Sequence, residues 1–171
     1  MSLYDSSADS RFPVGGVPMT LFAAAPSVRG RCIVTAMKSK PTLTLDDVRR
    51  MAAAAEAEAL QHEWAVTIAI VDDGGHLLWL QRLDGAPPIS AHIGPAKART
   101  AALGRRESGV YEEMINQGRT AFLSAPSLEG MLEGGVPIVV RGHCIGAVGV
   151  SGVKSTQDVQ IARAGIAALK P

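Results

Sequence analysis

Apolar residues recur over residues 44–62 with the three- and four-residue spacing of an amphipathic helix. Thr44 precedes them and can cap the first turn through its hydroxyl group. Asp46 and Asp47 follow at the positive end of the helix dipole, which favours carboxylates. The pattern predicts a helix that ends near His62 and buries Leu45, Val48, Met51, Ala52, Ala55 and Ala59.

The pattern then changes to β-branched runs separated by short turns rich in glycine. Two such pairs of runs predict two β-hairpins. The expected strands cover residues 65–71 and 76–82 in the first hairpin, and 137–140 and 144–151 in the second. Gly146, Gly149 and Gly152 recur at every third position in and just after the last of these strands. Such glycines indicate the close approach of a ligand or of another backbone, and packing by a helix or a partner subunit is the simpler explanation.

Two helices are expected between the hairpins. Ser90 or Gly94 opens the first, which runs to about Arg106 and holds Pro95 in its first turn, where the missing N–H is harmless. The second covers residues 108–117.

A last helix is expected from Ser155, with Asp158 three residues on as an approximate capping box. Its apolar stripe is Val159, Ala162, Ile166 and Leu169. Strands that come as hairpins pair antiparallel, and helices separate the two hairpins. The predicted fold class is therefore α+β, a central antiparallel sheet flanked by helices.

Composition narrows the choice of function. The chain has 171 residues and a net charge of +1, from 17 basic and 16 acidic residues. This balance argues against nucleic acid and membrane surfaces as partners. No apolar run has the length of a membrane span. Cys32 and Cys144 match no metal or redox motif, so we expect free thiols and a cytoplasmic protein.

The chain divides into two parts by composition. Residues 1–40 are rich in Ser, Gly and Pro without a sustained period, whereas residues 41–171 contain all the expected elements. We expect the first part to be an arm that packs on a neighbouring subunit, because its sequence has no core of its own.

Four stretches resemble the GlcG/HbpS family, which also supplies the C-terminal domain of PduO-type proteins. They are LTLDDVRRMAAAAEAEA, VTIAIVDDGGHLLWLQRLDGAPPIS, AKARTAA and EGGVPIVVRGHCIGAVGVSGVKSTQDVQIARAGIAAL. Together they cover about residues 41–170, in the order of the family. The resemblance implies a profilin-like fold and homo-oligomers. It links the chain to haem or corrinoid binding, although some members lie among catabolic genes without an agreed activity.

Candidate ligand-binding residues cluster before and within the second helix. Lys97 stands in the motif AKARTAA, where its ammonium could bind a carboxylate or a haem propionate. Asp84 and Arg82 lie in and before a proline-braced loop. Asp84 either caps its own turn or faces the same cavity as Lys97.

The loop of Glu133, Gly134 and Gly135 is a further candidate. Adjacent glycines expose backbone N–H groups that can bind an anion, and a plain flexible loop explains them equally well.

His92 is the histidine expected nearest to the pocket, between the proline loop and Lys97. It could ligate haem iron or transfer a proton, and a surface position is the simpler alternative. Three functions stay open. The first is haem or tetrapyrrole binding in storage, sensing or degradation. The second is a cofactor-free enzyme on a small oxo- or hydroxy-acid, with Lys97 as anchor and His92 or Asp84 moving a proton. The third is a structural oligomer.

Overall fold

The computed structural model describes residues 38–169. The chain divides into two units, residues 1–37 and 38–171, and all described elements belong to the second. The arm expected over residues 1–40 therefore lies almost wholly outside the described residues, as does Cys32.

The two predicted hairpins and the four predicted helices are all present. A 3₁₀ helix, η1, follows α3 and was not predicted. The elements are α1 (Leu45–Gln61), β1 (Thr67–Asp72), β2 (Leu77–Arg82), α2 (Ser90–Gly104), α3 (Ser108–Asn116), η1 (Thr120–Ser124), β3 (Gly135–Val140), β4 (His143–Ser151) and α4 (Ser155–Ala167).

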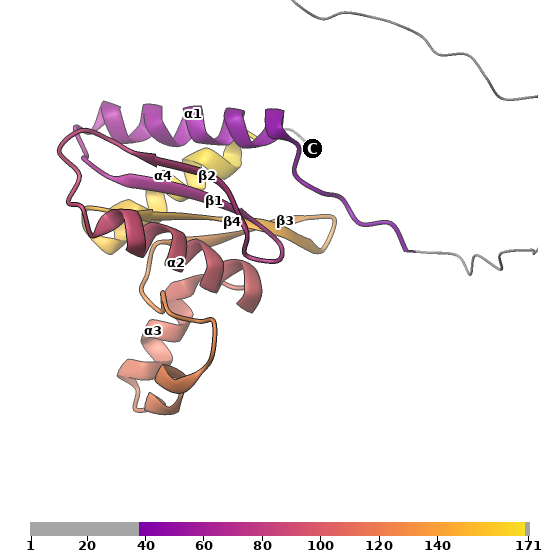
Figure 1. Ribbon diagram of the computed structural model, residues 1–171, viewed down its shortest axis with the longest axis vertical. Helices are drawn as coiled ribbons and strands as arrows, with labels where there is room; N and C mark the ends of the chain where they lie inside the picture. The colour runs from indigo at the N-terminus through magenta and orange to yellow at the C-terminus, as the bar shows by residue number, and fades with distance from the viewer. Residues whose placement is uncertain (1–37, 170–171) are drawn as a thin grey trace, which may run out of the picture. The chain divides into compact units, whose positions relative to one another are not determined.

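The four strands form one sheet in the order β2-β1-β4-β3, and every neighbouring pair is antiparallel. The two hairpins meet where β1 pairs with β4, with Ile68 opposite Val150. Figure 1 shows α1 and α2 on opposite sides of this sheet, with α4 on the side of α1. The α+β architecture predicted from the sequence is confirmed.

The two faces of the sheet are packed in different ways. The face toward α1 and α4 holds the larger core, which includes Met51, Ile68, Ile138 and Ile161. The buried cluster between the sheet and α2 consists of small residues, namely Ala69, Val71 and Ala147 of the strands and Ala98, Ala101 and Ala102 of the helix. Alanine on both partners lets the helix lie close to the strands, so α2 is held near the sheet backbone.

Gly149 marks the closest approach of α2 to the sheet. A Cβ atom at this position would lie 2.3 Å from the carbonyl oxygen of Gly94 and 2.4 Å from the nitrogen of Ala98. No side chain fits there without moving the helix. At Gly149, the close neighbour expected from the glycine spacing is therefore a helix.

The predicted N-terminal cap is present in the first helix, α1, but not in the last helix, α4. Thr44 caps α1, since its hydroxyl accepts from the Asp47 N–H (3.2 Å) while its own N–H donates to Asp47 Oδ2 (2.9 Å). The Thr44 hydroxyl and N–H hold the pKa of Asp47 below its usual value. The capping box of the last helix is wrong: Lys154 is the N-cap residue of α4, and Asp158 points into the protein instead.

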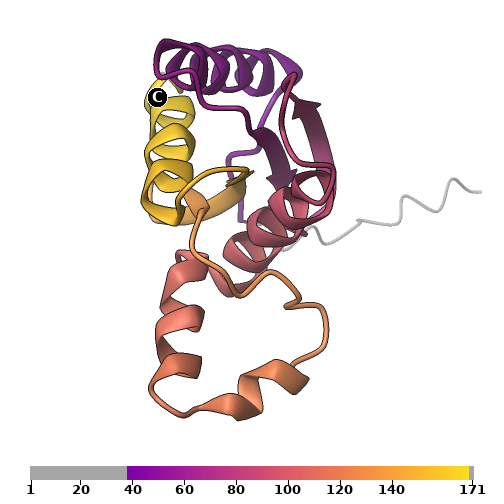
Figure 2. The ribbon, with the colours of Figure 1, turned by 90° about the vertical axis from the view of Figure 1, so that its left-hand side faces the viewer.

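Two further details bear on the site. Helix α2 begins at Ser90, so Pro95 lies inside the helix and not in its first turn. The segment of α3, η1 and the following loop extends away from the sheet (Figure 2). Among residues 38–169, no helix is long and apolar enough to cross a membrane.

Candidate functional site

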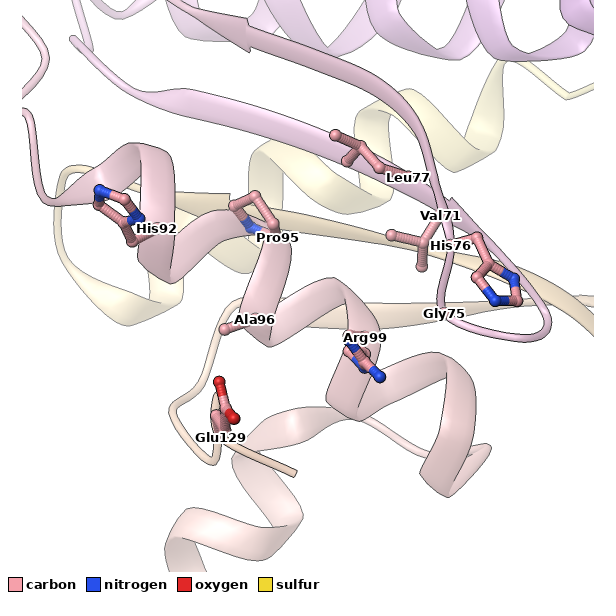
Figure 3. Close-up of a pocket in the computed structure, with 9 residues that line it drawn as sticks. All are labelled: Val71, Gly75, His76, Leu77, His92, Pro95, Ala96, Arg99 and Glu129. Carbon is pink, nitrogen blue, oxygen red and sulfur yellow. The ribbon is translucent and has the colours of Figure 1, made fainter. Parts of the chain in front are cut away.

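A groove of about 430 Å³ runs along the exposed side of α2, next to the hairpin of β1 and β2. This volume falls within the range typical of small-molecule sites. Figure 3 shows His92 and His76 at opposite ends of the groove and Arg99 between them. The nine lining residues are Val71, Gly75, His76, Leu77, His92, Pro95, Ala96, Arg99 and Glu129.

The helical repeat places the α2 side chains of the groove on one face. His92 and Arg99 are seven residues apart, which is about two turns and about 10 Å along the axis. Pro95 and Ala96 lie between them and supply an apolar wall. The result is a surface with an imidazole at one end, a guanidinium further along and apolar atoms between.

The strand side of the groove is also apolar. Val71 of β1 pairs with Leu77 of β2, and both side chains line the groove. Gly75, in the turn between the strands, lies against α2: a Cβ atom there would be 2.9 Å from Cγ of Arg99. A side chain at this turn would displace Arg99, so the glycine leaves that end of the groove open to it.

Glu129 reaches the groove from the loop after η1. The next residue, Gly130, lies directly on the backbone of α2, where a Cβ atom would be 2.2 Å from the carbonyl carbon of Ala96. The N–H of Gly130 donates to the hydroxyl of Thr100 (3.2 Å). These two contacts fix the loop on the helix and place a carboxylate beside the groove.

Lys97 points the other way, into the protein. Its residue is only 4% exposed, and its Nζ donates to Asp158 Oδ2 (2.8 Å) and to the carbonyl oxygen of Val150 (3.1 Å). Asp158 is 1% exposed. The two side chains form a buried ion pair that joins α2 to α4 past the end of β4.

Burial raises the pKa of Asp158 above its usual value, although the hydrogen bond and the charge of Lys97 oppose the rise. The carboxylate also accepts from the N–H of Val153 (3.4 Å). The protein thus keeps a charged pair where water cannot solvate it, which makes each partner depend on the other.

The structure does not bring the predicted site residues together. Lys97 is already bound by Asp158, so its ammonium is not presented to a ligand as we had expected. Asp84 is exposed and lines a different groove, with Glu56 and Trp64, rather than facing a cavity with Lys97. Arg82, at the end of β2, is exposed. His92 is the one predicted residue that lines the groove along α2.

The loop of Glu133, Gly134 and Gly135 packs against the buried pair of Lys97 and Asp158 through Gly134. Gly134 is buried, and a Cβ atom there would lie 2.8 Å from Nζ of Lys97. The N–H of Gly135 is taken by the hydroxyl of Ser108 (2.8 Å), so it is not free for an anion. Glu133 lines a separate surface groove beside α3.

Sequence reasoning missed Arg99 and Asp158. For Arg99 a signal existed, since it lies at helical spacing from His92. For Asp158 the sequence favoured a local cap, and only the packing of α4 against β4 shows its partner.

A family model described as "Haem degrading protein HbpS-like" matches residues 43–167. The chain belongs to the HbpS-like family. The resemblance stated from the sequence motifs is therefore confirmed. Among curated relatives, Protein GlcG of Escherichia coli (strain K12) is 57% identical over 115 residues, which is 67% of this chain and 85% of that protein.

Two solved structures have the same fold as this chain. A crystal structure of HbpS superposes with a TM-score of 0.72 at 30% identity and covers 79% of this chain and 95% of that one. A crystal structure of a PduOC–haem complex superposes with a TM-score of 0.69 at 28% identity and covers 75% of this chain and 95% of that one. Haem is thus bound in a crystal by a protein of this fold.

Proposed function

We propose that this protein binds haem or a related tetrapyrrole in the groove along α2, with His92 as the iron ligand. The observation that carries the proposal is the lining of the groove. An exposed imidazole and a guanidinium project from one helix face, and the wall between them is apolar. These three features fit haem, because its ring is apolar, its iron binds imidazole and its propionates are anionic.

The separate residues take distinct roles in this proposal. His92 would bind the iron, and Arg99 would pair with a propionate, for which a guanidinium is well suited. Val71, Leu77 and Pro95 would contact the ring. When bound, the haem iron supplies a site for ligand exchange or redox chemistry. The family model and the PduOC–haem complex support haem as the ligand class.

The alternative of a cofactor-free enzyme on a small acid has weaker support. That mechanism requires a free ammonium at Lys97 to anchor the substrate carboxylate. The ammonium instead donates to Asp158 and to the Val150 carbonyl, and the side chain is buried. His92 and Asp84 also line separate grooves, so they do not form an acid–base pair.

A hemin titration of the purified full chain tests the proposal. We expect a saturable Soret band for the wild-type protein, and a shifted band with at least about tenfold weaker affinity for His92→Ala. His143→Ala is the matched control, because this histidine is also exposed and lies outside the groove. A band that saturates identically in His92→Ala and wild type would refute His92 as ligand. A signal that never saturates in any variant would refute haem binding.

A further inference from the structure

A group of cationic side chains lies at one end of the sheet, apart from the groove along α2. Strands β1 and β4 are antiparallel, so the turn after β1 and the turn before β4 lie at this same end (Figure 1). Lys40 reaches it from the segment before α1 and forms an ion pair with Asp73 in the turn after β1. The last turn of α2 reaches it as well, because the Cys144 thiol donates to the carbonyl oxygen of Ala102 (Sγ–O 3.8 Å). Segments that are far apart in the sequence therefore meet here.

Two adjoining pockets are present at this end, with Lys40 and His143 in the wall of both. The first has a volume of about 260 Å³ and is completed by Asp73, Arg105, Val139, Gly142 and Cys144. The second has a volume of about 450 Å³ and is completed by Ser39, Pro41 and Arg141. Each pocket thus has an arginine of its own, and the two share an ammonium and an imidazole. Neither pocket has a residue in common with the groove along α2.

The charge in the two pockets is positive. Three cationic side chains line them, those of Lys40, Arg105 and Arg141, against the single carboxylate of Asp73. That carboxylate already pairs with Lys40. Within residues 38–169, neither Arg105 nor Arg141 forms an ion pair. Both guanidinium groups therefore keep their N–H donors for an anion, which a guanidinium binds through parallel hydrogen bonds.

Both arginines have a backbone conformation that favours other residues. Their φ angles are 53° at Arg105 and 50° at Arg141, in the left-handed region. Arg105 ends α2, a position where a left-handed residue is usually glycine. Arg141 and Gly142 form the two-residue turn between β3 and β4, where Asn-Gly is the favoured pair.

This strain points to a role for the two guanidinium groups. The non-glycine residues with positive φ in residues 38–169 are Glu63, Arg105, Ser127 and Arg141, so two of the four lie in these pockets. Residues held in such conformations cluster at functional sites, because the fold has to stabilise them at a cost. A requirement for arginine in the pockets explains why neither position holds the residue that its backbone favours.

We propose that the two pockets form one site for a small polyanion with two linked phosphoryl groups. Arg105 binds one phosphoryl group, Arg141 binds the other, and Lys40 lies between them. Two adjoining pockets with a shared wall match two anionic groups joined by a bridging oxygen. The cationic groups come from separate segments, which suits oxygen atoms arranged tetrahedrally on phosphorus better than the two coplanar oxygens of a carboxylate. The site is separate from the groove along α2, so the proposal does not depend on haem binding.

Asp73 gives an expectation of the opposite sign. Its carboxylate lines the first pocket, where it repels an anion and competes with it for the ammonium of Lys40. Asp73→Asn removes the repulsion and releases Lys40. This variant should therefore bind the polyanion more tightly than the wild-type protein, which general damage to the fold would not produce.

The test is calorimetric titration of the full chain with pyrophosphate at about 0.15 M salt, where long-range attraction between exposed charges is screened. Arg105→Asn and Arg141→Asn remove the guanidinium groups, and asparagine tolerates the left-handed conformation. Arg106→Asn is the matched control, because it removes the same charge one residue away. The Arg106 guanidinium lies over the ring of Tyr111, 5.6 Å from the centroid, and lines neither pocket.

We expect saturable binding of pyrophosphate to the wild-type protein, and affinity at least about tenfold lower for Arg105→Asn and for Arg141→Asn. Arg106→Asn should bind like the wild type, and Asp73→Asn should bind several-fold more tightly. Without pyrophosphate, the melting temperatures of Arg105→Asn and Arg141→Asn should equal or exceed that of the wild type, because asparagine relieves the strain. An equal loss of affinity in Arg106→Asn would reveal a general charge effect and overturn the site. Orthophosphate or succinate binding as tightly as pyrophosphate would overturn the assignment to two phosphoryl groups.

Cys144 reports where the anion binds. Its thiol lines the first pocket and is half-buried, so bound pyrophosphate should slow its alkylation. Iodoacetamide is the reagent, because it carries no charge, and mass spectrometry of the Cys144 peptide measures the rate. Alkylation of Cys144 at an unchanged rate under saturating pyrophosphate would place the anion elsewhere and overturn the proposal.

Discussion

The buried pair of Lys97 and Asp158 allows a sharp prediction about stability. Lys97→Met keeps the length and apolar stem of the side chain but removes the ammonium, which leaves the Asp158 carboxylate buried without its cationic partner. Breaking a buried ion pair on one side costs about 3–5 kcal/mol, because the remaining charge is not solvated. We expect a loss of this size in the free energy of unfolding at pH 7.

A surface pair in the same protein provides the comparison. Arg163 and Glu107 are also 2.8 Å apart, but their side chains are 62% and 40% exposed, against 5% and 2% for Lys97 and Asp158. Arg163→Met should cost at most about 1 kcal/mol, since water replaces the lost partner. The two pairs have the same N–O distance and differ in burial, so the difference between the two losses measures the effect of solvation.

The loss in Lys97→Met should also depend on pH. Burial already raises the pKa of Asp158, and without the Lys97 charge it rises further. The folded state then binds a proton more tightly than the unfolded state, whose Asp pKa is about 3.9. The contribution of Asp158 to the stability of the variant is therefore greatest below that value. It falls as pH rises through the folded-state pKa, by at most about 1.4 kcal/mol per pH unit.

Urea denaturation between pH 5 and pH 8 measures both effects, through the midpoint at constant m-value. The double variant Lys97→Met/Asp158→Leu should recover most of the loss, because no charge remains buried. The reasoning is wrong if Lys97→Met costs no more than Arg163→Met, or if its stability increases from pH 5 to pH 8.

Three other substitutions test the packing of α2, the cap of α1 and the hydrogen bonds of Asp72 in the turn after β1. Gly149→Ala should lower the free energy of unfolding by about 1–3 kcal/mol, because its Cβ atom would overlap the backbone at Ala98. An unchanged melting temperature in thermal unfolding would contradict this close contact. Thr44→Ala should cost about 1 kcal/mol in urea denaturation, since α1 loses its cap, and Thr44→Ser should restore it. Burial would raise the pKa of Asp72, but hydrogen bonds from His76 and Gly74 outweigh it and lower the pKa. Asp72→Asn should therefore destabilise the protein at neutral pH and have little effect at acid pH. Unfolding of both proteins, measured as the pH is lowered, checks this.

Local patterns were sufficient for the elements and their order. The periodic apolar positions of α1, the β-branched runs of the hairpins and the turn glycines each act over a few residues, so the chain itself contains the information. The motifs of the HbpS-like family were equally visible in the sequence, and the family model confirms them. The cap at Thr44 was correct because its partner, Asp47, is three residues away.

The candidate site was less accessible to the same reasoning. Lys97 and Pro95 are two residues apart on α2, yet the first is buried against α4 and the second lines the groove. Helical periodicity states that they point in different directions, but not which direction faces the sheet when alanines occupy so much of the helix. Lysine side chains are rarely buried unless they are paired, so the sequence alone did not indicate that Lys97 is the buried residue of the two.

What the sequence by itself determined is therefore the set of elements, the antiparallel pairing within each hairpin and the family. The tertiary structure alone decided that β1 pairs with β4, that Asp158 meets Lys97 across 61 residues of chain, and that β2 and β3 are the outer strands of the sheet formed by residues 38–169. The physical reason is range. Caps, turns and periodicity depend on neighbours in the chain, whereas the partner of a buried charge depends on how whole elements pack once water has been excluded.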